Sequence, residues 1–238
     1  MLIPCRRRYG LRLLLSFALV ACGATPTPLP SATEILEQSA QAMLTLRSAH
    51  FVIAREGAPA YVDPSNTFIF RRAEGDFVAP ASARAAVRVI GPALVTQVSV
   101  IAIGDQYWET HPLSGEWGNY SGLGYNPASL FHPDIGLAAL MQNDLSEAQL
   151  IGVEELEDWP GEPLFHLTAT APGESVRAMT ANLVGRGQVV FDWWIQPETY
   201  HVLRLRVTEP ETDPADPTVW LVDFDRFDTD ITIEPPTQ

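Results

Sequence analysis

The sequence has 238 residues, with 46% hydrophobic and 18% charged positions, which excludes a disordered chain and suits one large domain or two small ones. Fifteen basic residues against 29 acidic ones give a net charge of −14. This surplus makes nucleic acid and anionic lipid headgroups poor partners for the surface as a whole. All basic residues are arginines, so there is no lysine for a Schiff base or a P-loop.

The N-terminal segment has the features of a secretory signal. Residues 1–21 carry four arginines and no acid, followed by an apolar run over 13–21. In a helix this run is roughly 14 Å long, about half the thickness of a bilayer core, so it is too short to cross a membrane. A buried N-terminal helix is the alternative, but consecutive arginines do not suit a core. We therefore predict a signal peptide over 1–21.

The signal ends in a pattern that looks like a bacterial lipobox. Leu19, Val20 and Ala21 precede Cys22. In such signals the cysteine thiol takes a diacylglycerol and becomes the N-terminus after cleavage. Cys22 is therefore the predicted lipidation site, with palmitate among the expected acyl groups. Acyl chains contribute roughly 0.8 kcal/mol per buried CH₂ and would hold even an acidic protein at a membrane.

The mature chain would contain no other cysteine, because Cys5 lies in the signal. Zinc–thiolate sites and a cysteine nucleophile are thereby excluded. Residues 22–30 are rich in proline and predict an extended tether, about 25 Å long over 23–30. The domain prediction is a signal at 1–21, an acylated tether at 22–30 and one folded domain at 31–238.

The remaining sequence predicts helices and many strands. Ser31 and Glu34 form a capping-box pattern, which predicts a helix over 32–46. Asn126-Pro127 and His132-Pro133 predict helix starts in the middle of the chain, and a further short helix is predicted over 174–184. Alternating patterns predict strands at 49–55, 66–73, 81–91, 94–104, 106–111, 147–156, 163–171, 188–196, 200–209 and 217–228. This order predicts an α+β fold with one curved antiparallel sheet and helices on one side.

Familiar catalytic motifs are absent from the sequence. Each of the five histidines is a possible base, but a half-buried structural histidine is the commoner case. Asp223 and Asp225 resemble calcium ligands, yet they share the phase of a strand and lack the glycine of a calcium loop. We expect no enzyme, no cofactor and no metal.

Large aromatic residues are abundant on the predicted strands. Several strands are apolar in both phases, as in Val190 and Phe191. An antiparallel sheet with one wet face should be polar in one phase. Both faces are therefore covered, or one of them lines a cavity. The aromatic residues concerned are Phe68, Phe70, Trp108, Trp117, Tyr120, Phe191, Trp193, Trp194, Trp220 and Phe224.

The order of several short motifs resembles the LppX/LprAFG lipoproteins, which share the half-barrel fold of the lipoprotein carrier LolA. The similarity runs from about Leu44 to Pro236. His132 departs from the pattern, because members usually carry an acidic residue there. The matching segments are 46–51, 73–76 with Pro80, 105–108, 115–117, 125–130, 133–138, 152–155, 194–195 and 201–204.

This resemblance implies a sheet of about eleven strands, bent around helices that pack on its concave face, with an apolar cavity between them. It implies a membrane-anchored extracytoplasmic lipoprotein of the cell envelope that binds acylated lipid or glycolipid and carries it without catalysis. We expect a monomer on the outer face of the cytoplasmic membrane, with a membrane transporter as a possible partner. The predicted cavity residues are Phe70, Val87, Val89, Val98, Val100, Leu137, Leu140, Phe191, Trp193 and Leu203.

Two other functions remain open at this stage. One is a sensor or regulatory binding module on the same fold, like the RseB-type regulators. The other is a hydrolase or sugar-binding protein with a site that the sequence does not reveal. Since a one-residue error in strand phase would exchange the two faces, the cavity residues depend on the strand register.

Overall fold

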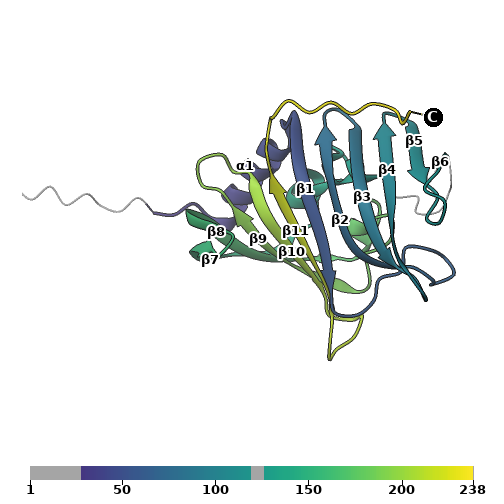
Figure 1. The fold of residues 1–238 in the computed structure, drawn as a ribbon. Coiled ribbons are helices and arrows are strands. Elements are labelled where there is room, and N and C mark those ends of the chain that lie inside the picture. Colours follow the sequence, from purple (N-terminus) through teal and green to yellow (C-terminus); the bar gives the residue numbers. More distant parts are fainter. Residues whose placement is uncertain (1–27, 119–125, 238) are drawn as a thin grey trace, which may run out of the picture.

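The computed structural model describes residues 28–118 and 126–237, and within these ranges eleven strands form one antiparallel sheet (Figure 1). The spatial order is β6-β5-β4-β3-β2-β1-β11-β10-β9-β8-β7. The strands are β1 (Ser48–Glu56), β2 (Ile69–Val78), β3 (Ser82–Ile90), β4 (Val95–Ile103), β5 (Gln106–Thr110), β6 (Trp117–Gly118), β7 (Ser146–Leu156), β8 (Trp159–Pro172), β9 (Gln188–Ile195), β10 (Val202–Glu209) and β11 (Thr218–Asp225).

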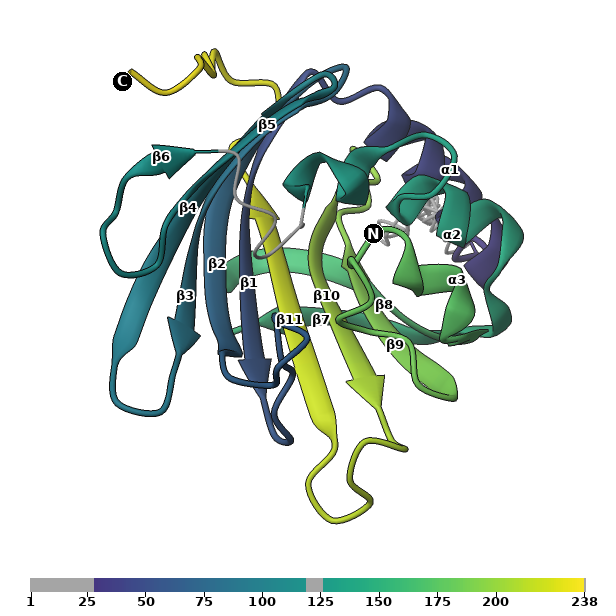
Figure 2. The ribbon, with the colours of Figure 1, turned by 90° about the vertical axis from the view of Figure 1, so that its right-hand side faces the viewer.

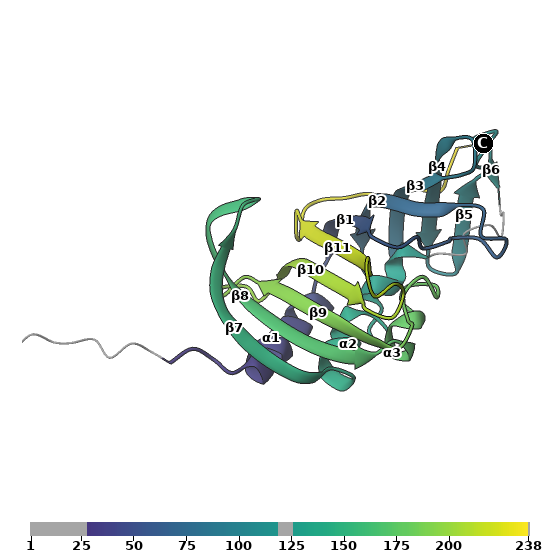
Figure 3. The same cartoon turned by 90° about the horizontal axis from the view of Figure 1, so that it is seen from below.

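The sheet consists of two runs of neighbouring strands that meet in its middle. The first run goes outward from β1 to β6, and the second comes inward from β7 to β11. The pairing of β1 with β11, with Phe51 opposite Phe224, joins the two runs across most of the chain length. Because β6 and β7 do not pair with each other, the sheet stays open and curves like a trough (Figure 3).

The two faces of the sheet follow from the alternation of side chains along each strand. On β3, Ala85 and Val87 are buried, whereas Arg84 and Arg88 are exposed. The buried residues continue in register onto β4, where Val100 lies opposite Ala85. The inner face is the one that carries these buried residues, and the outer face is the opposite one.

Four short helical segments complete the described fold: α1 (Ala32–Leu44), the 3-10 helix η1 (Pro127–Phe131), α2 (Leu137–Asn143) and α3 (Glu174–Arg177). They lie on the inner side of the sheet, with α1, α2 and α3 against the half formed by β7 to β10 (Figure 2). The capping box of α1 is confirmed, because the Glu34 N–H donates to the Ser31 hydroxyl and the Ser31 N–H donates to the Glu34 carboxylate. Helices on one face of a single antiparallel sheet confirm the α+β prediction.

Every predicted strand has a counterpart in the sheet, but β2 lies later than expected. The prediction was 66–73 and the strand is Ile69–Val78, because Gly75 is a strand residue and not part of a turn. A Cβ at Gly75 would collide with the ring of Phe51 and with the backbone of Arg84. This glycine therefore permits the close approach of two strands and a buried ring. The two-residue strand β6 was not predicted.

Two helix predictions were wrong in extent. The predicted helix over 174–184 ends at Arg177, and turns follow, in which Ala181 and Asn182 adopt left-handed conformations with φ of 49° and 64°. Pro133 does not begin a helix: residues 133–135 form a turn, and α2 begins only at Leu137. The Asn126-Pro127 start is confirmed, since the Asn126 side chain accepts the N–H of Ala128 in η1.

Candidate functional site

An apolar pocket lies on the inner face, between the middle of the sheet and the helical segments. Its volume is about 60 Å³. Ligand sites for small molecules commonly have about 300–1,000 Å³, so this pocket is the size of a few methylene groups. Its lining comprises Ile53, Phe70, Leu130, Leu137, Val176, Met179, Thr180, Leu183, Val184, Phe191, Leu205, Val207, Trp220 and Val222.

The lining combines a rigid side and an irregular side. The strands β1, β2, β9, β10 and β11 supply the rigid side through residues such as Phe70, Phe191 and Trp220. The segment 174–184, with its two left-handed residues, supplies five of the lining residues, among them Met179 and Leu183. Only Glu174–Arg177 of this segment is helical, so turns form most of this side of the pocket.

Glu209, at the end of β10, fastens this irregular wall to the sheet. The residue is only 2% exposed. Its carboxylate accepts the N–H groups of Gly185 at 3.0 Å and Arg186 at 3.4 Å, and the indole N–H of Trp220 at 3.0 Å. The Arg177 guanidinium closes the same segment by donating to the Gly185 carbonyl. One buried carboxylate thus connects a pocket-lining tryptophan to the irregular side of the pocket.

The structure brings three of the ten predicted cavity residues into the pocket lining: Phe70, Leu137 and Phe191. Leu140 and Trp193 are buried in the same core, outside the lining. The four valines are buried on the inner face of β3 and β4, towards the other half of the sheet; they are Val87, Val89, Val98 and Val100.

Leu203 is the predicted cavity residue that the structure places elsewhere. It packs with Leu164 and Trp194 in a separate cluster, not in the main core. The cause is an irregularity in the pairing of β10 with β9 between Val202 and Arg204, which shifts the alternation by one residue. The assignment of Leu203 to the inner face was therefore wrong.

The residues of the irregular wall were not predicted as cavity residues. Val176, Met179 and Leu183 belong to a segment that was interpreted as an ordinary helix, so their apolar pattern carried no separate signal. Leu205 and Val207 on β10 also line the pocket. They share the phase that was assigned to Leu203, so the alternation already pointed to them, but they were not among the predicted cavity residues.

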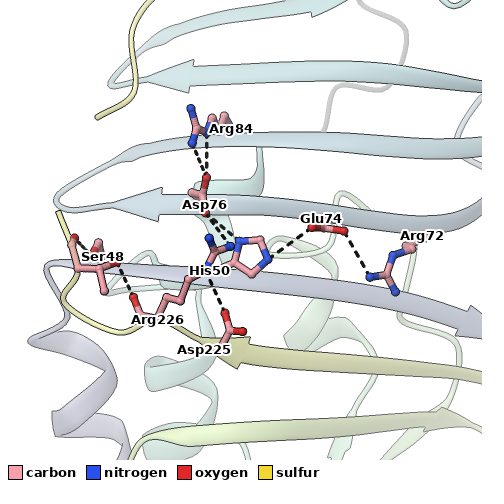
Figure 4. Close-up of polar contacts among 9 residues, drawn as sticks. Ser48, His50, Arg72, Glu74, Asp76, Arg84, Asp225 and Arg226 are labelled. Carbon is pink, nitrogen blue, oxygen red and sulfur yellow. Dashed lines mark hydrogen bonds and ion pairs between the residues drawn. The ribbon is translucent and has the colours of Figure 1, made fainter. Parts of the chain in front are cut away.

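The outer face of β1 and β2 carries a network of charged side chains (Figure 4). The His50 imidazole lies 2.8 Å from the Asp76 carboxylate and 3.7 Å from that of Glu74. Arg84 pairs with Asp76 at 2.7 Å, and Arg226 approaches it at 3.7 Å. Burial alone would raise the pKa of Asp76, but the hydrogen bonds from His50 and Arg84 outweigh it and hold this pKa below its usual value.

A second histidine lies between carboxylates on the outer face of the other half. His166 is 3.1 Å from Glu154 and 3.5 Å from Asp192, and its ring stacks on Trp194 at 4.6 Å. Among the described residues, no group of three or more histidine, cysteine, aspartate or glutamate side chains is arranged to hold a metal ion. Asp223, considered above as a calcium ligand, accepts hydrogen bonds from Arg204.

These features define a class of protein: an open antiparallel half-barrel whose inner face, covered by helices, is apolar. The chain belongs to the LppX/LprAFG lipoprotein family, whose model matches residues 31–233. The resemblance seen in the sequence is thereby confirmed.

Two solved structures have the same fold. LprF from Mycobacterium bovis is 16% identical, with a TM-score of 0.66 over 87% of this chain and 97% of that one. The lipoprotein LppX from Mycobacterium tuberculosis is 17% identical, with a TM-score of 0.59 over 85% and 98% of the two chains. A LolA superfamily protein from Nitrosomonas europaea is more distant, with a TM-score of 0.33 at 14% identity over 86% and 96%. The search of curated proteins finds no match.

The predicted signal peptide, Cys5, Cys22 and Tyr120 lie outside the described residues. Within 28–118 and 126–237, no helix has the length and apolar character needed to cross a membrane.

Proposed function

We propose that this protein is a membrane-anchored lipoprotein of the cell envelope that binds an acylated lipid or glycolipid between its sheet and its helices and carries it without chemical change. Cys22 carries the acyl anchor, residues 22–30 are the tether, and the domain at 31–238 binds the lipid as a monomer. The observation that carries this proposal is the pocket on the inner face, where thirteen of the fourteen lining residues are apolar.

The energetics of lipid transfer explain why such a pocket is useful. Exposing a sixteen-carbon chain to water costs on the order of 12 kcal/mol, at about 0.8 kcal/mol per CH₂. A protein that offers an apolar surface throughout the transfer lowers this barrier. Burial of the chain supplies the binding energy, so the proposal needs no catalytic group, cofactor or metal.

Binding requires the pocket to widen, because about 60 Å³ is too small for an acyl chain. We assign this widening to the segment 173–187, which contains the irregular side of the lining at 174–184 and the residues that Glu209 contacts. Release of the contacts between Glu209 and the backbone of Gly185 and Arg186 frees the wall while the strands keep their pairing. The empty form is then closed and the loaded form is open.

Extraction of the native protein tests this function directly. The full chain is purified in detergent from the membranes of a lipid-rich host, extracted with organic solvent, and the extract is analysed by mass spectrometry. We expect a non-covalent acyl lipid in addition to the covalent anchor. Finding only the covalent anchor, in protein that is folded by circular dichroism, would contradict the proposal.

A substitution in the movable wall tests where the lipid lies. Leu183 is half-buried in the pocket lining, so Leu183→Trp adds bulk to the pocket without disturbing the sheet. We expect Leu183→Trp to remove most of the co-purifying lipid. The matched control is Leu113→Trp, because Leu113 is 70% exposed in the turn that follows β5. Equal lipid content in both variants would contradict the assignment of the pocket.

The anchor has its own test. Cys22→Ala removes the only thiol in the predicted lipobox. We expect an unprocessed precursor without covalent acyl groups, detected by the mass of the intact protein. A processed and acylated Cys22→Ala product would overturn the anchor without bearing on the pocket.

A further inference from the structure

The charged network on the outer face forms one side of a larger groove. The groove has a volume of about 510 Å³, is lined mainly by β1, β2, β3, β4 and β6, and lies on the opposite side of the sheet from the apolar pocket. Four arginines line it from three directions: Arg72 on β2, Arg84 and Arg88 on β3, and Arg226 after the end of β11. Its size falls within the range of small-molecule sites.

The charge of this groove is opposite to that of the protein. Removal of the predicted signal takes four arginines and no acid, so the net charge changes from −14 to −14 − 4 = −18 and 15 − 4 = 11 arginines remain. Four of these eleven arginines line the groove, against the two carboxylates of Glu74 and Asp76. A local surplus of guanidinium groups on an acidic protein attracts an anion to this place in particular.

The arginines at the two ends of the groove differ in their ion pairs with neighbouring carboxylates. Arg84 donates to the Asp76 carboxylate through Nε at 2.9 Å and pairs with it through Nη2 at 2.7 Å. Arg72 makes only an exposed contact with Glu74, at 3.4 Å. Arg88 has no ion pair with any described residue. The end formed by Arg72 and Arg88 is therefore the one with free donors.

Arg72 and Arg88 are also direct cross-strand partners in the pairing of β2 with β3. Like charges at opposed positions of an antiparallel pair destabilise it, unless an anion lies between them. On the other side of Arg88, Gln97 is its partner on β4 and lines the same groove. Two guanidinium groups and an amide thus lie in one row across three strands.

Small residues leave space beside this row. Ala86 and Ser99 are opposed across β3 and β4, and both line the groove. The paired Arg84 lies four residues from Arg88 along β3, about 13 Å at roughly 3.3 Å per residue. Trp117 on β6 lines the side of the groove and offers an apolar surface. The groove therefore has a basic end, an open floor and an aromatic wall.

We propose that this groove binds the phosphate group of an organic phosphate, with the phosphate between Arg72 and Arg88 and the organic part along Ala86, Ser99 and Trp117. Guanidinium groups bind phosphate through paired N–H donors, and such charge-assisted hydrogen bonds are the strongest of their kind. The Asp76 network holds Arg84 and Arg226 at the far end, where they add to the positive potential. This site is independent of the apolar pocket and of the proposed lipid transport.

Phosphate binding by the full chain in detergent tests the proposal. Inorganic phosphate is titrated against the protein at low ionic strength and followed by isothermal titration calorimetry. We expect saturable binding that weakens about tenfold or more in Arg88→Gln, because a hydrogen bond to a charged group is lost. Arg72→Gln should weaken it similarly. No saturable binding by the unsubstituted protein would overturn the proposal.

Arg206 provides the matched control. It is an exposed arginine on β10, in register with Asp192 and Leu221, and it does not line the groove. Arg206→Gln changes the net charge as much as Arg88→Gln does. We expect phosphate affinity within about twofold of the unsubstituted protein, since a distant exposed charge is screened by salt. Equal loss in Arg88→Gln and Arg206→Gln would mean that phosphate responds only to net charge, and would overturn the site.

A second titration identifies the source of the phosphate. Glycerol phosphate represents a free metabolite, and dihexanoyl phosphatidylglycerol represents a lipid headgroup in soluble form. Tighter binding of the lipid, with the gain lost in Arg88→Gln, assigns the groove to headgroups. Equal or tighter binding of glycerol phosphate assigns it to free phosphates. A lipid affinity that is unchanged in Arg88→Gln, with no glycerol phosphate binding, would place the lipid in the apolar pocket alone and contradict the groove.

Discussion

The inner and outer faces of the same strands differ in their chemistry. On β3, alternate residues place Ala85 and Val87 in the core and Arg84 and Arg88 in the outer groove. The inner pocket is apolar and small, whereas the outer groove is charged and larger. One sheet can thus carry two chemically distinct sites about one backbone thickness apart, and substitutions should affect them separately.

The largest expected effect concerns the contact that closes the inner pocket. In the native protein the two carboxylate oxygens of Glu209 accept hydrogen bonds from the N–H groups of Gly185, Arg186 and the Trp220 indole. Glu209→Gln replaces one of these oxygens by an amide nitrogen, which cannot accept. Each buried donor left without an acceptor costs about 1–3 kcal/mol. We expect lower stability in urea and faster amide hydrogen exchange in 173–187.

Glu198→Gln is the control for this change, because Glu198 is exposed in the turn between β9 and β10. It should leave both stability and exchange unchanged. Phosphate binding in the outer groove should survive Glu209→Gln. Unchanged exchange in 173–187 would show that Glu209 does not hold the wall.

Substitutions of two neighbouring alanines on β3 distinguish the two faces most clearly. Ala85 is 5% exposed on the inner face, and Ala86 is half-buried on the floor of the outer groove. Ala85→Leu overpacks the core and should cost about 1–3 kcal/mol of unfolding free energy. Ala86→Leu should change stability by only about 0.5 kcal/mol and yet weaken phosphate binding, because it fills the floor. Equal destabilisation by both, in chemical denaturation, would refute this separation of the faces.

The smallest expected effect is a pH dependence on the outer face. The pKa of Asp76 is lowered in the folded protein, since the hydrogen bonds from His50 and Arg84 outweigh burial. A lowered pKa contributes stability above the carboxyl's unfolded value, and this contribution is lost as the pH falls through the folded pKa. In melting curves from pH 6 to pH 2, the stability advantage over Asp76→Asn should therefore shrink towards acid. An advantage that stays constant over this range would contradict the role of Asp76.

The alternation of residues was sufficient to predict the sheet and the inner face of its regular strands. Phe70 on β2 and Phe191 on β9 were predicted and line the pocket, as does Leu137 of the helix α2. Leu203 was not predictable in this way, because a bulge changes the phase of β10 and leaves no mark in the local pattern.

The outer groove is formed by residues that become neighbours only through the pairing of strands. The register of this pairing cannot be read from short stretches of the sequence. Arg72 and Arg88 are sixteen positions apart, and only the pairing of β2 with β3 makes them neighbours. His50 and Asp76 meet for the same reason across β1 and β2. The predicted strand 66–73 also ended before Glu74 and Asp76, so these two residues were not expected on the sheet.

The central claim is that a fatty chain enters between the sheet and the segment 173–187. Photolabelling of the full chain with a diazirine analogue of palmitic acid, followed by peptide mass spectrometry, tests this claim most directly. The account predicts saturable labels on pocket residues such as Leu183, Phe191 and Leu205, which excess palmitic acid removes. Labels confined to the outer face, or labels that excess palmitic acid does not remove, would contradict it.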